Sequence, residues 1–165
     1  MRENASGLIL DLRNNGGGLL QEAVDVASVF LDGGVVLIEN TTTGEQEFLA
    51  EVGGLALDVP IIVLINNGTA SAAELVAGAL QDRGRALVVG QTSYGKGTIQ
   101  QIFTLSDSSS IHVTSAEWFT PDGYALDGVG LIPDIVMIPD QTGRDVELLE
   151  AIRVLHDEQI SMELN

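Results

Sequence analysis

The chain has 165 residues, a formal net charge of −17 at pH 7, a hydrophobic share of 45% and no cysteine. Length and hydrophobic share indicate one globular domain with a buried core. The charge argues against a nucleic-acid partner, because phosphates would be repelled. The lack of cysteine excludes disulfides, thiolate metal sites and a cysteine nucleophile. No run approaches the roughly 18 apolar residues of a membrane-spanning helix.

The first third of the chain predicts a strand, a glycine-rich loop and a helix. Residues 8–13, LILDLR, form a near-continuous apolar run, which is typical of a strand covered on both faces. The loop 14–18, NNGGG, lets the backbone approach another group closely. Apolar residues follow helical spacing over 19–31, and the pair Gly33–Gly34 ends that predicted helix.

The middle of the chain predicts a hairpin, a buried strand and a second helix. Residues 35–38 and 47–50 indicate the two strands of a β-hairpin. The apolar run 61–65 predicts a buried strand, which leads into a second Asn-Asn-Gly loop at 66–68. Residues 71–82, rich in alanine and leucine, predict a helix.

The last part of the chain predicts three strands, a turn and a helix. Residues 86–89 indicate a short buried strand, and two longer strands follow at 99–105 and 110–119. The sequence PDG at 121–123 is typical of a turn. Residues 145–156 predict an amphipathic helix.

Alternating strands and helices predict an α/β fold with a largely parallel central sheet. Ligands in such folds bind at the carboxyl ends of the strands. Three loops, at 14–18, 66–68 and 95–97, each follow a predicted strand. We therefore expect these three loops to converge at one edge of the sheet.

Ser71 lies at the predicted turn between a strand and a helix. Backbone N–H groups at the start of a helix are unpaired and carry partial positive charge. A nucleophile there lies beside an oxyanion site, with the Ala72 N–H as a donor. The run from Ser71 to Glu74 is also the capping box S-x-x-E, which explains the serine without catalysis. This segment alone leaves both interpretations open.

A serine nucleophile needs a base, and the chain offers few. The two histidines, His112 in a predicted strand and His156 near the end of the last helix, fit structural or surface positions. Lys96 is the only lysine, it lies between two glycines, and it follows Ser71 after one helix and one strand. A lysine replaces histidine as the base if desolvation lowers its pKa from about 10.4 towards neutrality. Gln100 would hold the amine, although an ordinary polar strand residue needs no such role.

The motifs together resemble the carboxy-terminal processing proteases, also called tail-specific proteases. Residues 10–18, LDLRNNGGG, resemble that family's D-L-R-N-N-x-G-G stretch, and residues 68–74, GTASAAE, resemble its G-S/T-A-S-A-S-E motif. Residues 90–100 are similar to its G-x-x-x-x-G-K-G-x-x-Q motif. Two later segments, 119–123 and 128–134, resemble Y-T-P-x-G and G-x-x-P-D. The resemblance covers nearly the whole chain.

The resemblance implies a crotonase/ClpP-like α/β core with a mainly parallel sheet, flanking helices and a β-hairpin. It implies a serine endopeptidase that cleaves proteins near their carboxyl terminus through an acyl-enzyme, without a metal or an organic cofactor. One departure is Ala73, where many relatives have a second serine. The site residues that the resemblance implies are Ser71 as nucleophile, Lys96 as general base, Gln100 as the orienting glutamine, and the backbone N–H groups of Gly17, Gly18 and Ala72 at the oxyanion.

Residues 1–165 are expected to form only part of a protease catalytic domain. The family carries an upstream signal or anchor, a PDZ domain that captures substrate tails, and the opening strands of the core, and none of these is recognised here. We therefore expect a fragment that can be inactive alone. The resemblance further implies an exported protein, in the periplasm, cell envelope or thylakoid lumen. Its expected partners are protein or peptide substrates presented by their C-termini. Whether the protein also forms a homo-oligomer is left open by the resemblance.

The sequence has three alternative interpretations besides a protease. Residues 90–96, GQTSYGK, fit the G-x-x-x-x-G-K of a P-loop nucleotide binder. Gly97, however, stands where a P-loop needs Ser or Thr for magnesium, and a strand is predicted where a helix should follow. An acyl-thioester enzyme on the same fold would use the oxyanion loops without a serine nucleophile, which leaves the lone lysine unexplained. The third alternative is a non-enzymatic fragment or interaction module.

Overall fold

A parallel sheet forms the centre of the computed structural model, which describes residues 6–163. Its strands are β1 (Leu8–Asp11), β4 (Ile61–Ile65), β5 (Leu87–Gly90) and β8 (Ile135–Val136), in that spatial order. Every neighbouring pair is parallel. The structure confirms the predicted parallel sheet and adds β8, whose two residues are too short to give a sequence pattern.

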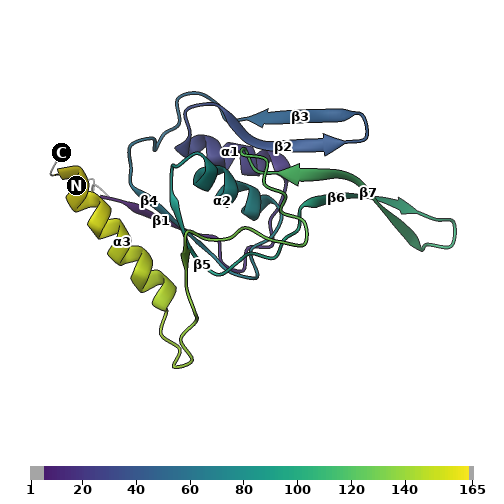
Figure 1. Cartoon of the computed structure of the whole chain (residues 1–165). Coiled ribbons are helices and arrows are strands. Elements are labelled where there is room, and N and C mark those ends of the chain that lie inside the picture. The colour runs from purple at the N-terminus through teal and green to yellow at the C-terminus, as the bar shows by residue number, and fades with distance from the viewer. Residues whose placement is uncertain (1–5, 164–165) are drawn as a thin grey trace.

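A second, antiparallel sheet joins two hairpins. Its strands are β3 (Gly44–Leu49), β2 (Val35–Thr41), β7 (Ser110–Phe119) and β6 (Thr98–Thr104), in that order. The β2–β3 hairpin was predicted; β6 and β7 were predicted as two strands, but neither their pairing as a hairpin nor the union of β2 with β7 was. The outer half of the β6–β7 hairpin projects from the body (Figure 1).

Helices cover both faces of the parallel sheet. Helices α1 (Leu20–Phe30) and α2 (Ala72–Asp82) pack together on one face, and α3 (Val146–Glu163) lies on the other (Figure 1). Alternate residues of β4 point to opposite faces: Val63 belongs to the core beneath α1 and α2, and Leu64 to the core beneath α3. This arrangement explains why the whole of β4 is apolar and buried.

The expectation that the first strand is covered on both faces holds only in part for β1: Leu10 packs on the core beneath α1 and α2 and Ile9 on the core beneath α3, but the strand is not fully buried. Leu8 is 37% exposed, Ile9 and Leu10 are half-buried, and Asp11 is exposed. The reason is its place in the described sheet, where β1 pairs on one side only, with β4. An apolar run therefore identified the strand but not its burial.

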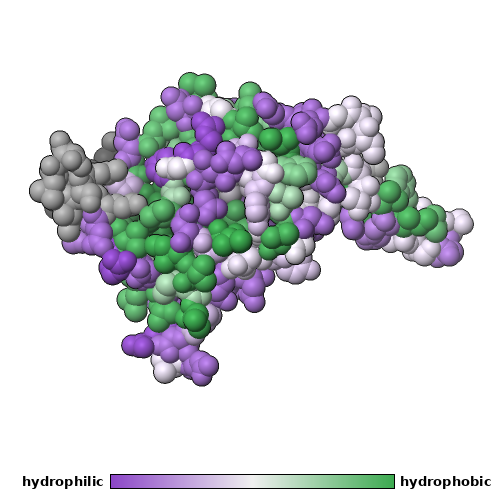
Figure 2. All heavy atoms as spheres, viewed as in Figure 1, coloured by the Kyte–Doolittle hydropathy of each residue, from purple (hydrophilic) through white to green (hydrophobic). Residues whose placement is uncertain are grey.

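Exposed apolar side chains gather on the projecting hairpin. Ile102 and Phe103 of β6 and Ile111 of β7 are about half exposed or more, at 63%, 51% and 49%. Figure 2 shows hydrophobic side chains near the outer end of this hairpin. Among the described residues, no helix has both the length and the apolar character needed to cross a bilayer.

Candidate active site

The three predicted loops meet at the carboxyl ends of the parallel strands, as expected. The Asn14 N–H donates to Asn66 Oδ1 at 2.9 Å, and the Ala70 N–H donates to the Asn15 carbonyl at 2.9 Å. The third loop joins them where the Tyr94 N–H donates to the Thr69 carbonyl, also at 2.9 Å. Backbone hydrogen bonds therefore fix the three loops to one another.

Thr69 is a buried polar residue at this junction, and the sequence did not single it out. Its side chain is fully buried. Its hydroxyl donates to the Leu12 carbonyl at 2.8 Å and accepts the Asn66 N–H at 3.0 Å. Thr69 thus ties the end of β1 to the end of β4, directly before the candidate nucleophile.

Ser71 occupies the N-cap of α2 in an unusual backbone conformation. Its φ of 55° and ψ of −125° lie where side chains with a Cβ are disfavoured. Gly17 lies against it, because a Cβ on Gly17 would be 2.9 Å from Ser71 Cβ and 2.7 Å from the Ala70 carbonyl oxygen. The close approach explains a glycine at position 17, whose φ of +93° also suits glycine.

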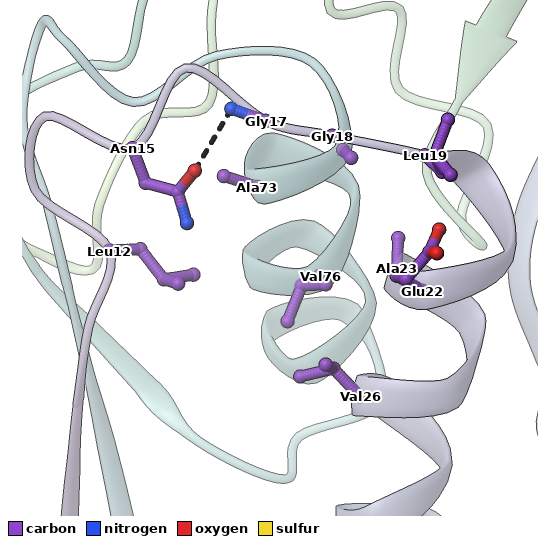
Figure 3. A pocket seen from close by; sticks show the side chains of 11 residues that line it. Leu12, Asn15, Gly17, Gly18, Leu19, Glu22, Ala23, Val26, Ala73 and Val76 are labelled. Carbon is purple, nitrogen blue, oxygen red and sulfur yellow. Dashed lines mark hydrogen bonds between the residues drawn. The ribbon is translucent and has the colours of Figure 1, made fainter.

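Two of the three predicted oxyanion donors are open. The Gly17 N–H donates to Asn15 Oδ1 at 3.0 Å, as Figure 3 shows. The N–H groups of Gly18 and Ala72 have no hydrogen-bond acceptor among residues 6–163. The arrangement therefore offers Gly18 and Ala72, rather than Gly17, to an incoming oxygen.

An apolar pocket of about 160 Å³ lies beside these donors, between α1 and α2 (Figure 3). The backbone of Gly17 and Gly18 forms part of its wall. Its apolar lining side chains are those of Leu12, Leu19, Ala23, Val26, Ala72, Ala73 and Val76. Such a pocket accepts an apolar side chain of moderate size.

Glu74 connects Ser71 with the Lys96 loop. Its carboxylate is fully buried and accepts the Ser71 N–H at 2.7 Å, as a capping box predicts. It also accepts the N–H groups of Gly95 at 2.7 Å and Lys96 at 2.9 Å. The sequence pattern predicts only the helix-capping role of Glu74. The missed signal is a single carboxylate in a helix whose residues 72–80 are otherwise apolar.

The Lys96 backbone is fixed, but its side chain is exposed. Its ammonium makes no hydrogen bond or ion pair with the residues that the structure describes. Gln100, on β6, is exposed as well, and its side chain has no hydrogen bond within 6–163. These surroundings differ from the dry environment that a neutral lysine requires.

The glycines beside Lys96 pack on the segment 126–130. A Cβ on Gly95 would lie 2.7 Å from the Gly130 nitrogen, and one on Gly97 would collide with the Asp127 backbone. The Gly97 N–H donates to Asp127 Oδ1 at 3.2 Å. The later motif therefore supports the Lys96 loop. Strand β6 follows that loop, so the geometry lacks the helix of a P-loop.

A second cluster of charges joins the loops to α3. The Arg13 guanidinium donates to Asp11 and to Asp145, both at 2.7 Å, and these hydrogen bonds hold the pKa of each carboxyl below its ordinary value. Glu147 is buried, lies 3.8 Å from Arg13 and accepts from Gln91 Nε2 at 3.2 Å. This cluster ties Arg13, which follows β1, and Gln91, which follows β5, to the start of α3.

Neither histidine makes a hydrogen bond with Ser71. His112 is exposed and lies 3.1 Å from the Ser110 hydroxyl, and His156 is exposed on α3. Within the described ranges, no group of three or more histidine, aspartate or glutamate side chains lies close enough to hold a metal ion.

The sequence profile of peptidase family S41 matches residues 1–137. A carboxyl-terminal-processing protease of Synechocystis is 46% identical over 135 residues, which cover 82% of this chain and 32% of that protein. A chloroplastic C-terminal processing peptidase of Tetradesmus obliquus is 40% identical over 147 residues, which cover 88% of this chain and 32% of that protein.

A solved structure gives the same result. The photosystem II D1 C-terminal processing protease is 40% identical, with a TM-score of 0.76 over 91% of this chain and 39% of that one. The chain thus spans about a third of the length of the curated relatives it matches. Profile, relatives and structure agree on the family that the sequence motifs resemble. The chain belongs to peptidase family S41.

Proposed function

We propose that the chain carries the Ser–Lys dyad of a serine endopeptidase that cleaves proteins near their carboxyl terminus. Ser71 Oγ attacks the peptide carbonyl carbon while neutral Lys96 takes the hydroxyl proton. The C–N bond then breaks, Lys96 delivers the proton to the leaving amine, and the acyl-enzyme is hydrolysed. The observation that carries this proposal is the strained Ser71 at the start of α2, beside the open Ala72 N–H.

Gly18 and Ala72 supply the oxyanion donors in this proposal, because the Gly17 N–H is engaged by Asn15. The apolar pocket between α1 and α2 adjoins both donors. It receives the side chain of the residue whose carbonyl is attacked, and its size favours a small or medium apolar residue.

Lys96 and Gln100 complete the proposed machinery once substrate covers them. Both side chains are exposed, so the desolvation that keeps an amine neutral has to come with a bound peptide. Gln100 then orients the amine.

Labelling with a fluorophosphonate probe tests the nucleophile. We expect Ser71→Ala to abolish labelling, whereas the exposed Ser109→Ala on the hairpin turn should leave it intact. Lys96→Ala should abolish peptide cleavage, in which the bound peptide covers the amine, while the free energy of unfolding changes by less than about 0.5 kcal/mol, because the side chain is exposed. Full labelling of Ser71→Ala, or unchanged peptide cleavage by Lys96→Ala, would contradict the dyad.

A non-enzymatic peptide-binding module is the second candidate. The exposed Lys96 side chain favours it. Binding of apolar-ended peptides without any labelling of Ser71 would support this alternative.

The location and the wider domain stay predictions. An exported location is supported by the chloroplastic C-terminal processing peptidase of Tetradesmus obliquus among the relatives. Substrates presented by their C-termini are supported by the processing proteases among the relatives. We also expect residues 1–165 to belong to a larger catalytic domain that is accompanied by a PDZ domain. The absence of a cofactor and the formation of a homo-oligomer are expectations of the same kind.

A further inference from the structure

We propose that Glu74 is a positioning residue, which fixes the backbone of the nucleophile relative to the backbone of the base. The inference rests on the proposed function of Ser71 and Lys96. One oxygen, Oε2, accepts both the Ser71 N–H at 2.7 Å and the Lys96 N–H at 2.9 Å. A single atom thus joins the two halves of the dyad.

The other oxygen is equally occupied. Oε1 accepts the Ser93 hydroxyl at 2.5 Å and the Gly95 N–H at 2.7 Å. Ser93 is itself buried, and its hydroxyl accepts the Leu131 N–H at 2.6 Å, so its proton is directed at Glu74. All four partners are donors, which uses the whole acceptor capacity of an ionised carboxylate. No neutral side chain of this size accepts four hydrogen bonds.

Helix capping alone does not explain this arrangement. A capping box needs only the bond from Ser71, which glutamine also supplies. A buried carboxylate without a cation is costly unless hydrogen bonds replace its hydration, and no ion pair of Glu74 occurs among the described residues. Three of the four bonds come from the segment 93–96. The carboxylate is therefore suited to joining two loops.

The bond to Ser71 bears on reactivity because the backbone there is strained. A conformation at φ 55° persists only where its surroundings fix it. Glu74 holds the peptide nitrogen of Ser71, and Thr69 and Gly17 confine the neighbouring atoms. A displacement of about 1 Å at a reacting group lowers rates by about 100-fold.

The test compares Glu74→Gln with Glu147→Gln in the full chain. Both remove one buried carboxylate, but Glu147 contacts Arg13 and Gln91, not Ser71 or Lys96. In Glu74→Gln an amide NH₂ replaces one acceptor and faces two donors. We expect fluorophosphonate labelling of Ser71 to slow by about 10- to 100-fold, and amide hydrogen exchange at Lys96 and Gly95 to accelerate. In Glu147→Gln the labelling rate of Ser71 and the amide exchange rates at Lys96 and Gly95 should stay within about twofold of those of the unchanged chain.

The charge-conserving Glu74→Asp should slow labelling less than Glu74→Gln does. Unchanged labelling in Glu74→Gln would overturn the inference, and so would an equal slowing in both glutamine variants, which indicates general destabilisation. If the unchanged chain does not label at Ser71, the proposed function fails. Amide exchange then still decides whether Glu74 fixes the two loops, and unaltered exchange at Lys96 would refute that.

Discussion

The two halves of the candidate dyad are held in different ways. Around Ser71, the backbone and the Cβ lie in a framework formed by Thr69, Glu74 and the close-packed Gly17. Around Lys96 only the backbone is fixed, and the amine lies in solvent. The difference shows that the chain fixes the loop framework, with the open N–H groups of Gly18 and Ala72, before any ligand binds. The surroundings of the base have to be completed by whatever covers it.

Gly17→Ala should break the nucleophile half and have the largest effect. The new Cβ would overlap the Ala70 carbonyl and Ser71, at a φ of +93° that disfavours alanine. We expect a loss of about 2–4 kcal/mol in the free energy of unfolding and a fall of more than about 100-fold in Ser71 labelling. Urea unfolding and probe labelling measure the two effects.

Gly16→Ala is the matched control, because a Cβ there meets no atom within 4 Å. The rate of Ser71 labelling in Gly16→Ala should stay within about twofold of that of the unchanged chain. Equal effects at both glycines would show that loop flexibility, rather than the contact with Ser71, matters.

The elements and the meeting of the three loops were predictable because each depends on local pattern. The apolar run of β4 and the Asn-Asn-Gly loops carry their own signals in the sequence. The partners of Glu74 and Thr69 do not, since each is contributed by a loop elsewhere in the chain. The pairing of β2 with β7 was missed for the same reason, with Ile38 opposite Phe119.

The exposure of Lys96 was not predictable either. Its isolation between two glycines indicated a tightly packed loop, and the packing is real but involves the backbone of 126–130. A sequence pattern identifies a close approach without saying which atoms approach. The chemistry of a lysine side chain therefore needs its solvent exposure as well as its position.

Ser71→Gly should sharpen the comparison by releasing strain from the nucleophile half. Both Ser71→Gly and Ser71→Ala remove the hydroxyl, but only glycine adopts a φ of 55° freely. We expect the glycine variant to be more stable than the alanine variant, with a free energy of unfolding about 1–2 kcal/mol higher in urea titrations. Equal stability of the two would mean that the loop stores no strain at this residue.

Arg13→Gln tests the outer cluster, and its effect should depend on pH. Hydrogen bonds from Arg13 lower the pKa of Asp145 and Asp11, so their contribution to stability is present above the ordinary value of about 3.9 and disappears as pH falls through the lowered values. At pH 7 we expect a loss of about 1 kcal/mol, because both carboxyls are partly exposed. The loss should shrink below pH 4. A difference that is constant from pH 7 to pH 3 would exclude this electrostatic origin.

Gln100→Ala should have the smallest effect and examines the base half directly. The side chain is exposed and has no hydrogen bond in the described part of the chain, so stability should change by less than about 0.5 kcal/mol, as for Gln46→Ala on the exposed β3. If Gln100 orients Lys96 only when substrate covers both, labelling by a small probe should fall by less than about tenfold, whereas peptide cleavage should fall further. Equal losses with probe and peptide would place the orienting contact in the free chain instead. The base half would then be as preorganised as the nucleophile half.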